Sequence, residues 1–380
     1  MSNVDAQTLG GRIRDARKRA GVSQDELGRT IGLERTAVNK IEGGIRKVTA
    51  LELSDIAAAI GVRMSTLLDE TIPALVSHRS SQGLDTVDSQ IDALLAKLAS
   101  EVEFVGSLGG EQTMLGAGED VRRSDLHPPS SNVAAEALAG QARALMDLEA
   151  EEPIGTLSND VATIGLLAFS RDIGKDTADA GMISSPHCGV ALVNSYMKVG
   201  RRRLALAHEL GHYLIADDYT VDWRVSEYTD QDVPMESRID RFARALLLPE
   251  TALTREWPEM VERFGVRGAA IFLASKFRVD MATLAARLND MRLVDGTVIA
   301  SVRRSRTNKA DIVEMGLYVP PEELEGTTVP LTFSRAVLRL VRDERVSRER
   351  ALDLLQGTFD DADLPDIRER RHDEIWNFVS

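Results

Sequence analysis

The chain has a single cysteine and no long apolar run. Because Cys188 stands alone, no internal disulfide can form, which favours a reducing cytoplasm. No apolar run approaches the ~20 residues needed to cross a bilayer. The first thirty residues also lack the apolar core and cleavage site of a signal peptide. With 43% hydrophobic and 28% charged residues in a length of 380, we expect a cytoplasmic globular protein of two or three domains, without membrane contact.

Acidic residues dominate the chain except at its start. The net charge is −14, yet residues 1–48 hold ten Lys and Arg against six Asp and Glu, a local charge of +4. Phosphate attraction is a local field effect, so a small basic head on an acidic body suits contact with nucleic acid. The alternative is a basic face that is merely solvated.

Residues 9–69 carry apolar residues at helical spacing, broken by glycine-containing turns, which predicts five short helices. Ser23 and Glu26 form a capping box that opens a helix at Gln24. Gly32 then allows a tight turn into a helix over 34–42.

The stretch 22–62, VSQDELGRTIGLERTAVNKIEGGIRKVTALELSDIAAAIGV, resembles the helix-turn-helix of Xre/Cro-type repressors. The resemblance implies that the helix over 34–42 enters the major groove of DNA. Its expected base readers are Arg35, Thr36 and Asn39, and the expected phosphate contacts are Gln24, Arg46 and Lys47. The alternative is a helical packing module that binds no DNA.

After residues 1–70, the composition of residues 71–131 predicts a linker with one amphipathic helix over 88–105. The rest of this segment is rich in Gly, Ser and Pro and cannot bury enough apolar surface to fold. Later patterns predict helices over 134–148 and about 236–248. Strand-like runs cover 164–170 and 189–197, and the region 256–380 is mostly helical. An extended pair is expected at 296–304 and 315–320.

The stretch 201–217, RRRLALAHELGHYLIAD, places His208 and His212 four positions apart. On a helix both imidazoles project from one face and can reach one zinc ion. Glu209 lies ~100° around the helix, where it can reach a water on the metal without ligating. This H-E-x-x-H arrangement uses the glutamate as general base.

A catalytic zinc needs a third protein ligand and an open position. Asp217 and Asp218 follow His212 too closely to fold back onto the same helix face. Glu236 opens the next helix and is the preferred third ligand, with Glu227 and Asp230 as competitors. Asp240, one turn after Glu236, can accept the other ring N–H of a ligating histidine.

Residues 153–249, and more loosely to 292, resemble the ImmA/IrrE family of bacterial metallopeptidases. The resemblance rests on PIGTLSNDVATIGLLAF, on GVALVNSYMKVGRRRLALAHELGHYLIAD and on MESRIDRFARALLLPE. It implies that His208, His212 and Glu236 bind Zn²⁺, with Mn²⁺ as a substitute in vitro, and that Glu209 is the general base. Arg238 departs from the pattern, since relatives often have a second acid there.

The implied reaction is zinc-assisted peptide hydrolysis. An oxyanion stabiliser is expected, for which Tyr196, Tyr219 and Tyr228 are available. The strand over 190–194 is expected to hold an extended substrate by edge pairing.

Two further features are interpreted as structural. Residues 266–294 can form a second helix-turn-helix, but they hold too few well-placed bases and are expected to pack against the peptidase. Cys188 is expected to be a small buried residue.

The expected fold is mainly α with a small sheet. It comprises a five-helix helix-turn-helix domain (1–70), a linker (71–131), a zincin-like metallopeptidase domain (132–292) and a helical C-terminal extension (293–380). The expected function is a stress-responsive transcription regulator that binds operator DNA and cleaves a repressor- or antitoxin-like protein, or itself. A homodimer is compatible with the sequence. The alternative is a repressor whose metal-binding fold is a structural or sensing module without proteolysis.

Overall fold

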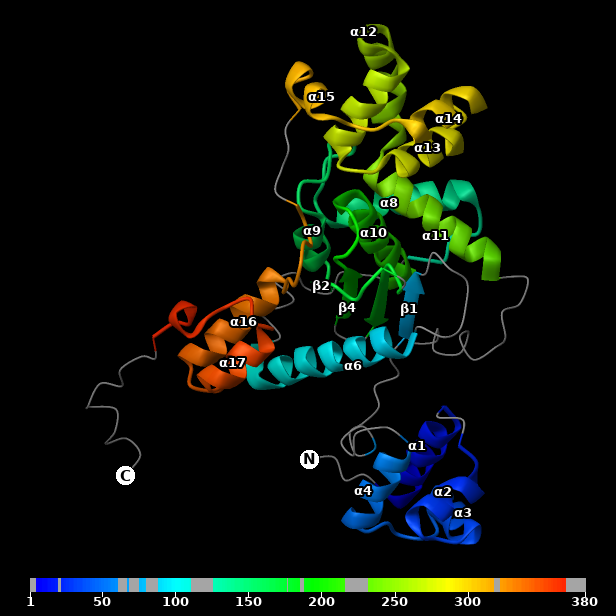
Figure 1. The fold of residues 1–380 in the computed structure, drawn as a ribbon, viewed down its shortest axis with the longest axis vertical. Coiled ribbons are helices and arrows are strands. Elements are labelled where there is room, and N and C mark those ends of the chain that lie inside the picture. The colour runs from blue at the N-terminus through cyan, green and yellow to red at the C-terminus, as the bar shows by residue number, and fades with distance from the viewer. Residues whose placement is uncertain are drawn as a thin grey trace. The chain divides into compact units, whose positions relative to one another are not determined.

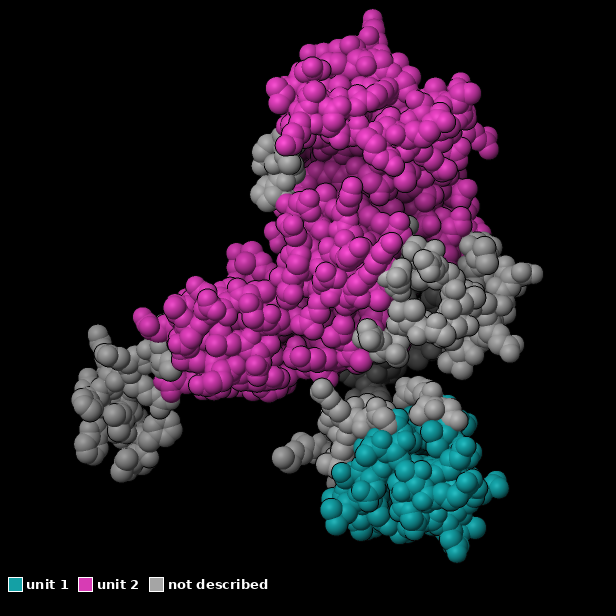
Figure 2. Space-filling model, viewed as in Figure 1, with its two compact units in different colours: residues 1–74 teal, residues 75–380 magenta. Residues whose placement is uncertain are grey.

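The computed structural model describes residues 5–19, 22–60, 67, 75–79, 88–110, 126–175, 177–184, 188–215, 232–317 and 322–366. Contacts divide the chain into two compact units, unit 1 (residues 1–74) and unit 2 (residues 75–380), which Figure 2 colours separately. The architecture is α+β, with a small sheet among many helices, and confirms the fold class expected from the sequence. None of the described helices is long and apolar enough to span a bilayer.

Unit 1 contains the described helices α1 (Ala6–Arg19), α2 (Gln24–Ile31), α3 (Arg35–Glu42) and α4 (Ala50–Ala59). A capping box opens α2: the Ser23 hydroxyl accepts from the Glu26 N–H, and the Glu26 carboxylate accepts from the Ser23 N–H. Gly32 ends α2 in the left-handed region at φ 69°, which turns the chain into α3. The expected fifth helix falls almost wholly outside the described residues. The core of unit 1 includes Ile13, Leu27, Val38, Ile41 and Ile56.

Unit 2 is organised on a four-stranded sheet of order β1-β3-β4-β2 (Figure 1). Its strands are β1 (Leu75–Arg79), β2 (Leu166–Arg171), β3 (Ala180–Ser184) and β4 (Gly189–Asn194). The inner strand β4 is parallel to β2 and antiparallel to β3, while β1 pairs antiparallel with β3 on its other side. The two expected strands are therefore neighbours, and β1 and β3 join them.

Helices cover both faces of this sheet (Figure 1). Along β4, Ala191 and Val193 pack on one face and Val190 and Leu192 on the other. Strands buried on both faces appear in sequence as unbroken apolar runs, which explains the pattern of residues 189–193.

The two faces carry different sets of helices. On the α10 face, α9 (Leu157–Thr163) and α10 (Val199–Ile215) contact the strands. The core on this side continues away from the sheet through α8 (Asn132–Leu145), α11 (Asp232–Leu247), α12 (Glu250–Phe277) and α13 (Met281–Asp290). The opposite face, here the α6 face, is covered by α6 (Asp88–Val105), α16 (Leu331–Arg342) and α17 (Arg348–Leu354). The helices α14 (Gly296–Arg304) and α15 (Lys309–Glu314) follow α13.

The structure differs from expectation in two segments. Residues 296–304, expected to be extended, form α14, because the Asp295 carboxylate caps the N–H groups of Thr297 and Val298 and the buried Val302 packs into the α10-face core. In residues 71–131, expected to be a linker with one helix over 88–105, that helix is confirmed as α6, but β1 was not expected and both elements pack into unit 2. The apolar residues of α6 recur at helical spacing and pack on the sheet: Ile91, Leu95, Leu98, Val102 and Val105.

The segment 322–328 is fastened to the first turns of α10. Arg203 is fully buried and forms an ion pair with the buried Glu323, whose other carboxylate oxygen accepts from the Ser158 N–H at 2.6 Å. Arg202 donates to the Glu323 carbonyl at 2.9 Å and pairs with Glu322 at 2.8 Å. Buried cations of this kind anchor the connection to α16 on the same helix that carries His208.

We predict that Glu323→Ala lowers the free energy of unfolding of unit 2 by about 3–5 kcal/mol, because it leaves the Arg203 charge buried without its partner. Urea unfolding followed by tryptophan fluorescence measures this, since all three tryptophans belong to unit 2. The control is Asp343→Asn, which removes half of the exposed Arg339–Asp343 pair and should change stability by less than about 0.5 kcal/mol. Equal effects of the two variants would contradict the prediction.

Candidate functional site

Two neighbouring helices of unit 2 bring the predicted metal ligands together. His208, Glu209 and His212 lie on α10, where residues 202–215 are all buried, and Glu236 and Asp240 lie on α11. The Nε2 atoms of His208 and His212 are 3.2 Å apart. The Glu236 carboxylate closes the group, with Oε2 3.2 Å from His208 Nε2 and Oε1 3.3 Å from His212 Nε2.

This donor set fits a divalent metal ion. One ligand atom from each of His208, His212 and Glu236 lies within 4.8 Å of the others, so that one ion can contact all three. Two imidazoles with one carboxylate are typical of catalytic zinc, which leaves a fourth position for water or substrate. The Glu236 side chain is 42% exposed, so the group is open to solvent on that side.

The charge state of the group also suits a metal. Burial acts to raise the pKa of Glu236, but hydrogen bonds from His208 and His212 outweigh it, and the pKa lies well below its ordinary value. Asp240 Oδ1 is 3.0 Å from His208 Nδ1. A proton on Nδ1 donated to this carboxylate leaves the Nε2 lone pair of His208 directed at the metal position.

Three other residues that the sequence analysis singled out in unit 2 are described by the structure. Tyr196 is 54% exposed, and Arg238 donates to the carbonyl of Pro129 at 3.2 Å. Cys188 is buried, as expected. Outside the described residues lie Asp217, Asp218, Tyr219, Glu227, Tyr228 and Asp230.

Strand β4 cannot hold a substrate by edge pairing. It lies between β2 and β3 and is paired with both, so the expectation for residues 190–194 is wrong. The apolar run at 189–193 indicates burial on both faces, but it carries no information on which strand lies at an edge.

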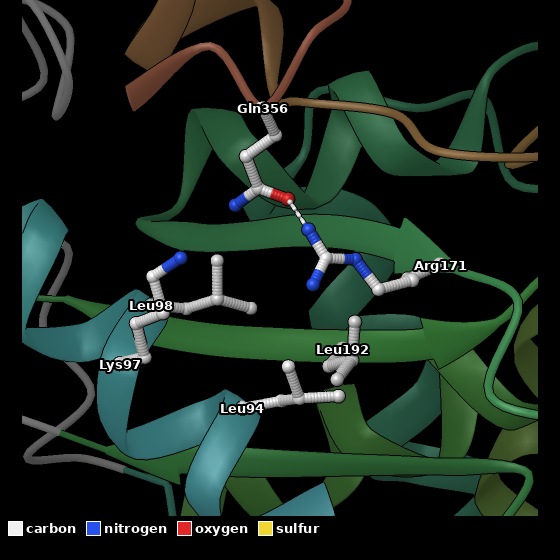
Figure 3. Close-up of a pocket in the computed structure, with 6 residues that line it drawn as sticks. All are labelled: Leu94, Lys97, Leu98, Arg171, Leu192 and Gln356. Atoms are coloured by element: carbon white, nitrogen blue, oxygen red, sulfur yellow. Dashed lines mark hydrogen bonds between the residues drawn. The ribbon is translucent and has the colours of Figure 1, made fainter. Parts of the chain in front are cut away.

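A small cavity on the α6 face of the sheet does not serve this site. It lies between α6, β2, β4 and Gln356, which accepts a hydrogen bond from Arg171 at 3.0 Å (Figure 3). Its volume of about 10 Å³ is the space of a single water molecule at most. It is therefore too small for a cofactor or a peptide side chain.

In unit 1, α3 presents polar side chains to solvent. Arg35, Thr36 and Asn39 are all exposed, at the start of α3 and one turn later. Gln24 lies at the first position of α2 and donates to Glu42 Oε2 at 2.7 Å and, more weakly, to Asn39 Oδ1 at 3.5 Å. Gln24 therefore positions α2 against α3 as well as facing their common surface.

Glu42 is held in turn by a buried ion pair. Arg17 of α1 donates to both of its carboxylate oxygens, at 2.6 and 3.1 Å. Arg46 pairs with Glu52 at 2.5 Å, and Lys47 is exposed. The three helices that shape the exposed surface of α3 are thus cross-linked by side chains, which keeps the surface rigid.

Comparison with known families identifies both regions. Residues 13–67 match the helix-turn-helix family model, and residues 166–289 match the M78 peptidase family, described as the IrrE N-terminal-like domain. The chain carries a helix-turn-helix domain and an IrrE-like domain. Both resemblances predicted from the sequence are confirmed.

The IrrE-like domain also has a curated relative. The radiation response metalloprotease IrrE of Deinococcus radiodurans is 35% identical over 89 residues, which are 23% of this chain and 26% of the relative. The chain thus spans about a quarter of the length of that protein.

Two solved structures each match a short part of the chain. The restriction-modification controller protein C.AhdI from Aeromonas hydrophila is 31% identical, over 16% of this chain and 94% of its own, with a TM-score of 0.16. The hypothetical transcription factor NHTF from Neisseria is 34% identical, over 17% of this chain and 74% of its own, with a TM-score of 0.16. Scores this low add nothing to the description of the fold.

The candidate metal-binding residues His208, His212 and Glu236, here called the metal group, depend on a close approach of α10 and α11. A Cβ added at Gly211, between the two histidines, would lie 2.9 Å from Ile239 Cγ2 and 2.9 Å from Phe242 Cδ1. Both neighbours are fully buried, so a shift of either would disturb the packing of the core. Glycine at this position lets α11 bring Glu236 within reach of His208 and His212.

We predict that Gly211→Ala lowers the free energy of unfolding by about 1–3 kcal/mol through overpacking. Gly140→Ala is the matched control: Gly140 is an exposed helical glycine of α8 with nothing within 4 Å of an added Cβ. That substitution should raise stability by about 0.5–1 kcal/mol. Urea unfolding followed by tryptophan fluorescence distinguishes the two, and a neutral Gly211→Ala would refute the close-packing argument.

Proposed function

We propose that this chain is a transcription regulator that binds DNA through residues 1–70 and hydrolyses a protein substrate at a zinc ion in the domain 132–292. The observation that carries the proposal is the convergence of His208, His212 and Glu236, with ligand atoms within 4.8 Å of one another. Residues 71–131 would lie between the two domains in sequence, with β1 and α6 packed into unit 2, and 293–380 would extend the second.

The ligand set favours zinc over harder cations. Imidazole nitrogens suit zinc and other transition metals, whereas Mg²⁺ and Ca²⁺ prefer oxygen ligands throughout. Mn²⁺ accepts a mixed set of this kind and is the expected substitute in vitro. A bound zinc ion would supply Lewis acidity to a water molecule and to the scissile carbonyl.

The protein groups around it would handle the proton. Glu209 is fully buried on α10, next to His208 in sequence and about a quarter turn around the helix from it. Its carboxylate would take the proton of the attacking water and return it to the leaving amine nitrogen. Asp240 would hold the His208 ring in the tautomer that ligates through Nε2.

The substrate class follows from the pairing of the two domains. A tether between them gives the peptidase an effective concentration near the operator of roughly millimolar order. A weakly recognised protein bound at the same operator would then be cut in preference to others. A repressor- or antitoxin-like protein, or this chain itself, fits that requirement, and the relative's role in radiation response favours a stress signal as the trigger.

DNA binding would use the exposed surface of α3. Arg35 and Asn39 can form bidentate hydrogen bonds with guanine and adenine respectively, and Thr36 can contact either base or methyl groups. Lys47 is exposed and lies just beyond α3, where it would contact phosphate. Arg46, although paired with Glu52, would contribute to the same backbone contact.

We predict about one zinc per chain in the purified wild type, and its loss in the double variant His208→Ala/His212→Ala. Glu209→Gln should keep the metal, because Glu209 is not a ligand, but should abolish cleavage. Metal content by mass spectrometry gives the first result, and the appearance of new protein N-termini in cells expressing wild type or Glu209→Gln gives the second.

The two readouts separate the two hypotheses. Normal metal content in the double histidine variant would refute the ligand assignment. Zinc binding combined with identical N-termini and identical promoter activity in wild type and Glu209→Gln would favour the alternative, a metal-binding structural or sensing module without proteolysis.

We predict that Arg35→Ala and Asn39→Ala relax sequence preference, each costing about 1–3 kcal/mol at the base that it contacts. Lys47→Ala should instead weaken all sequences alike and reduce the slope of log affinity against log salt by about one. Selection from a random DNA pool by the full chain, followed by titrations at several salt concentrations, measures both. The control Arg342→Ala lies at the exposed end of α16 and should change neither.

A further inference from the structure

Strand β1 occupies an edge that the sheet would otherwise leave open. Without β1, the order of the remaining strands is β3-β4-β2, and β3 lies at the end. β1 pairs antiparallel along the whole of β3, from Leu75 opposite Ser184 to Arg79 opposite Ala180. The backbone groups of β3 on this side are therefore satisfied by a segment about a hundred residues earlier in the chain.

On the opposite edge of the sheet, a different part of the chain bridges one residue of β2. Ser170 of β2 exchanges two backbone hydrogen bonds with Thr328, each of 3.1 Å, and their hydroxyl groups are 2.6 Å apart. Thr328 belongs to the segment that Arg202 and Arg203 hold through Glu322 and Glu323. Among the described residues, β3 is thus the edge that is covered along its length, by a short strand that an extended peptide could replace.

The β3 edge adjoins the helix that carries the metal group. Both β3 and β1 contact α10, the helix of His208, Glu209 and His212. A peptide added to β3 would lie where β1 lies, against this helix. Edge addition fixes a peptide in extended form by main-chain hydrogen bonds, largely independent of its sequence.

We propose that the edge of β3 is the docking surface for an extended protein substrate, and that residues 75–79 occupy it intramolecularly. A substrate binds as an antiparallel strand in place of β1. This inference rests on the proposed peptidase function, because it assigns the binding mode and the competitor of that same site.

The position of β1 in the chain supports its role as a competitor. It begins at the first residue of unit 2, directly after unit 1 ends at residue 74. Because β1 is part of the same chain, it competes at a high effective concentration. The apparent affinity for an added peptide is therefore reduced in proportion to the fraction of molecules that have released β1. Five residues form a short strand, which holds by few main-chain hydrogen bonds.

The test uses the full chain carrying Glu209→Gln, so that nothing is cleaved and binding alone is measured. The probe is a fluorescent peptide copying residues 73–81, PALVSHRSS. Two adjacent proline variants, Val76→Pro and Ser77→Pro, form a matched pair. In an antiparallel strand, the backbone N–H groups of alternate residues point to the same neighbouring strand. One of the two prolines therefore removes a hydrogen bond to β3, whereas the other replaces an N–H that points away from β3 and is tolerated in an edge strand.

We expect one proline variant to bind the peptide at least about tenfold more tightly than the other proline variant, and than the Glu209→Gln chain without either proline. In that variant hydrogen exchange of the β3 amides should accelerate, and the peptide should restore their protection. Exchange in β4 should stay slow, which shows that the sheet persists. Equal peptide affinity in all three proteins, or unchanged exchange of β3, overturns the proposal, since the peptide would then add to the outer edge of β1 or bind elsewhere.

An engineered disulfide between β1 and β3 gives a second, independent test if the proline variants unfold the sheet. Leu75→Cys with Ser184→Cys joins two residues that lie opposite each other in the register. Peptide binding should be lost in the oxidised protein and return on reduction. Binding that is unaffected by the disulfide refutes competition at β3. Neither experiment needs hydrolysis, so a chain that fails to cleave any protein can still pass or fail this test.

Discussion

The packing of α10 against α11 is the contact on which the rest of unit 2 depends. It is close because Gly211 presents no side chain to Ile239 and Phe242, and this closeness sets Glu236 beside His208 and His212. The same α10 lies against β3 and β4, and its first turns hold the connection to α16 through two buried arginines. One helix therefore supports the metal group, the sheet and the attachment of the C-terminal helices.

Much of this site was predictable because its spacing is local. The four-residue separation of His208 and His212 implies one helix face, and that of Glu236 and Asp240 implies another, whatever the tertiary fold. Helical period alone does not distinguish Glu236 from Glu227 or Asp230 as the third ligand; the start of a helix near residue 236 favours Glu236. The structure starts that helix at Asp232, which leaves Glu236 one turn inside it.

The errors concern features that depend largely on non-local contacts. Residues 189–193 show that a strand is buried on both faces, but strand order depends on pairing with residues far away in sequence, and β4 proved to be internal. Val298, Ile299 and Val302 suit a strand by composition, yet a cap at Asp295 and packing into the core make 296–304 helical. Polar surroundings in 71–131 obscured the contribution of β1 to the sheet.

The pairing of β1 bears on why a DNA-binding unit shares a chain with the IrrE-like domain. If substrate and β1 compete for β3, the substrate shifts the population in which the segment next to unit 1 is released. Such coupling is reciprocal. If DNA binding to unit 1 favours release of residues 75–79 and so raises the affinity for substrate, then substrate binding raises the affinity for DNA by the same factor. A coupling of this kind requires no contact between the two units, only that both binding events act on residues 75–79. Proteolysis would then be tied to operator occupancy through one short strand, in addition to the proximity that a tether provides.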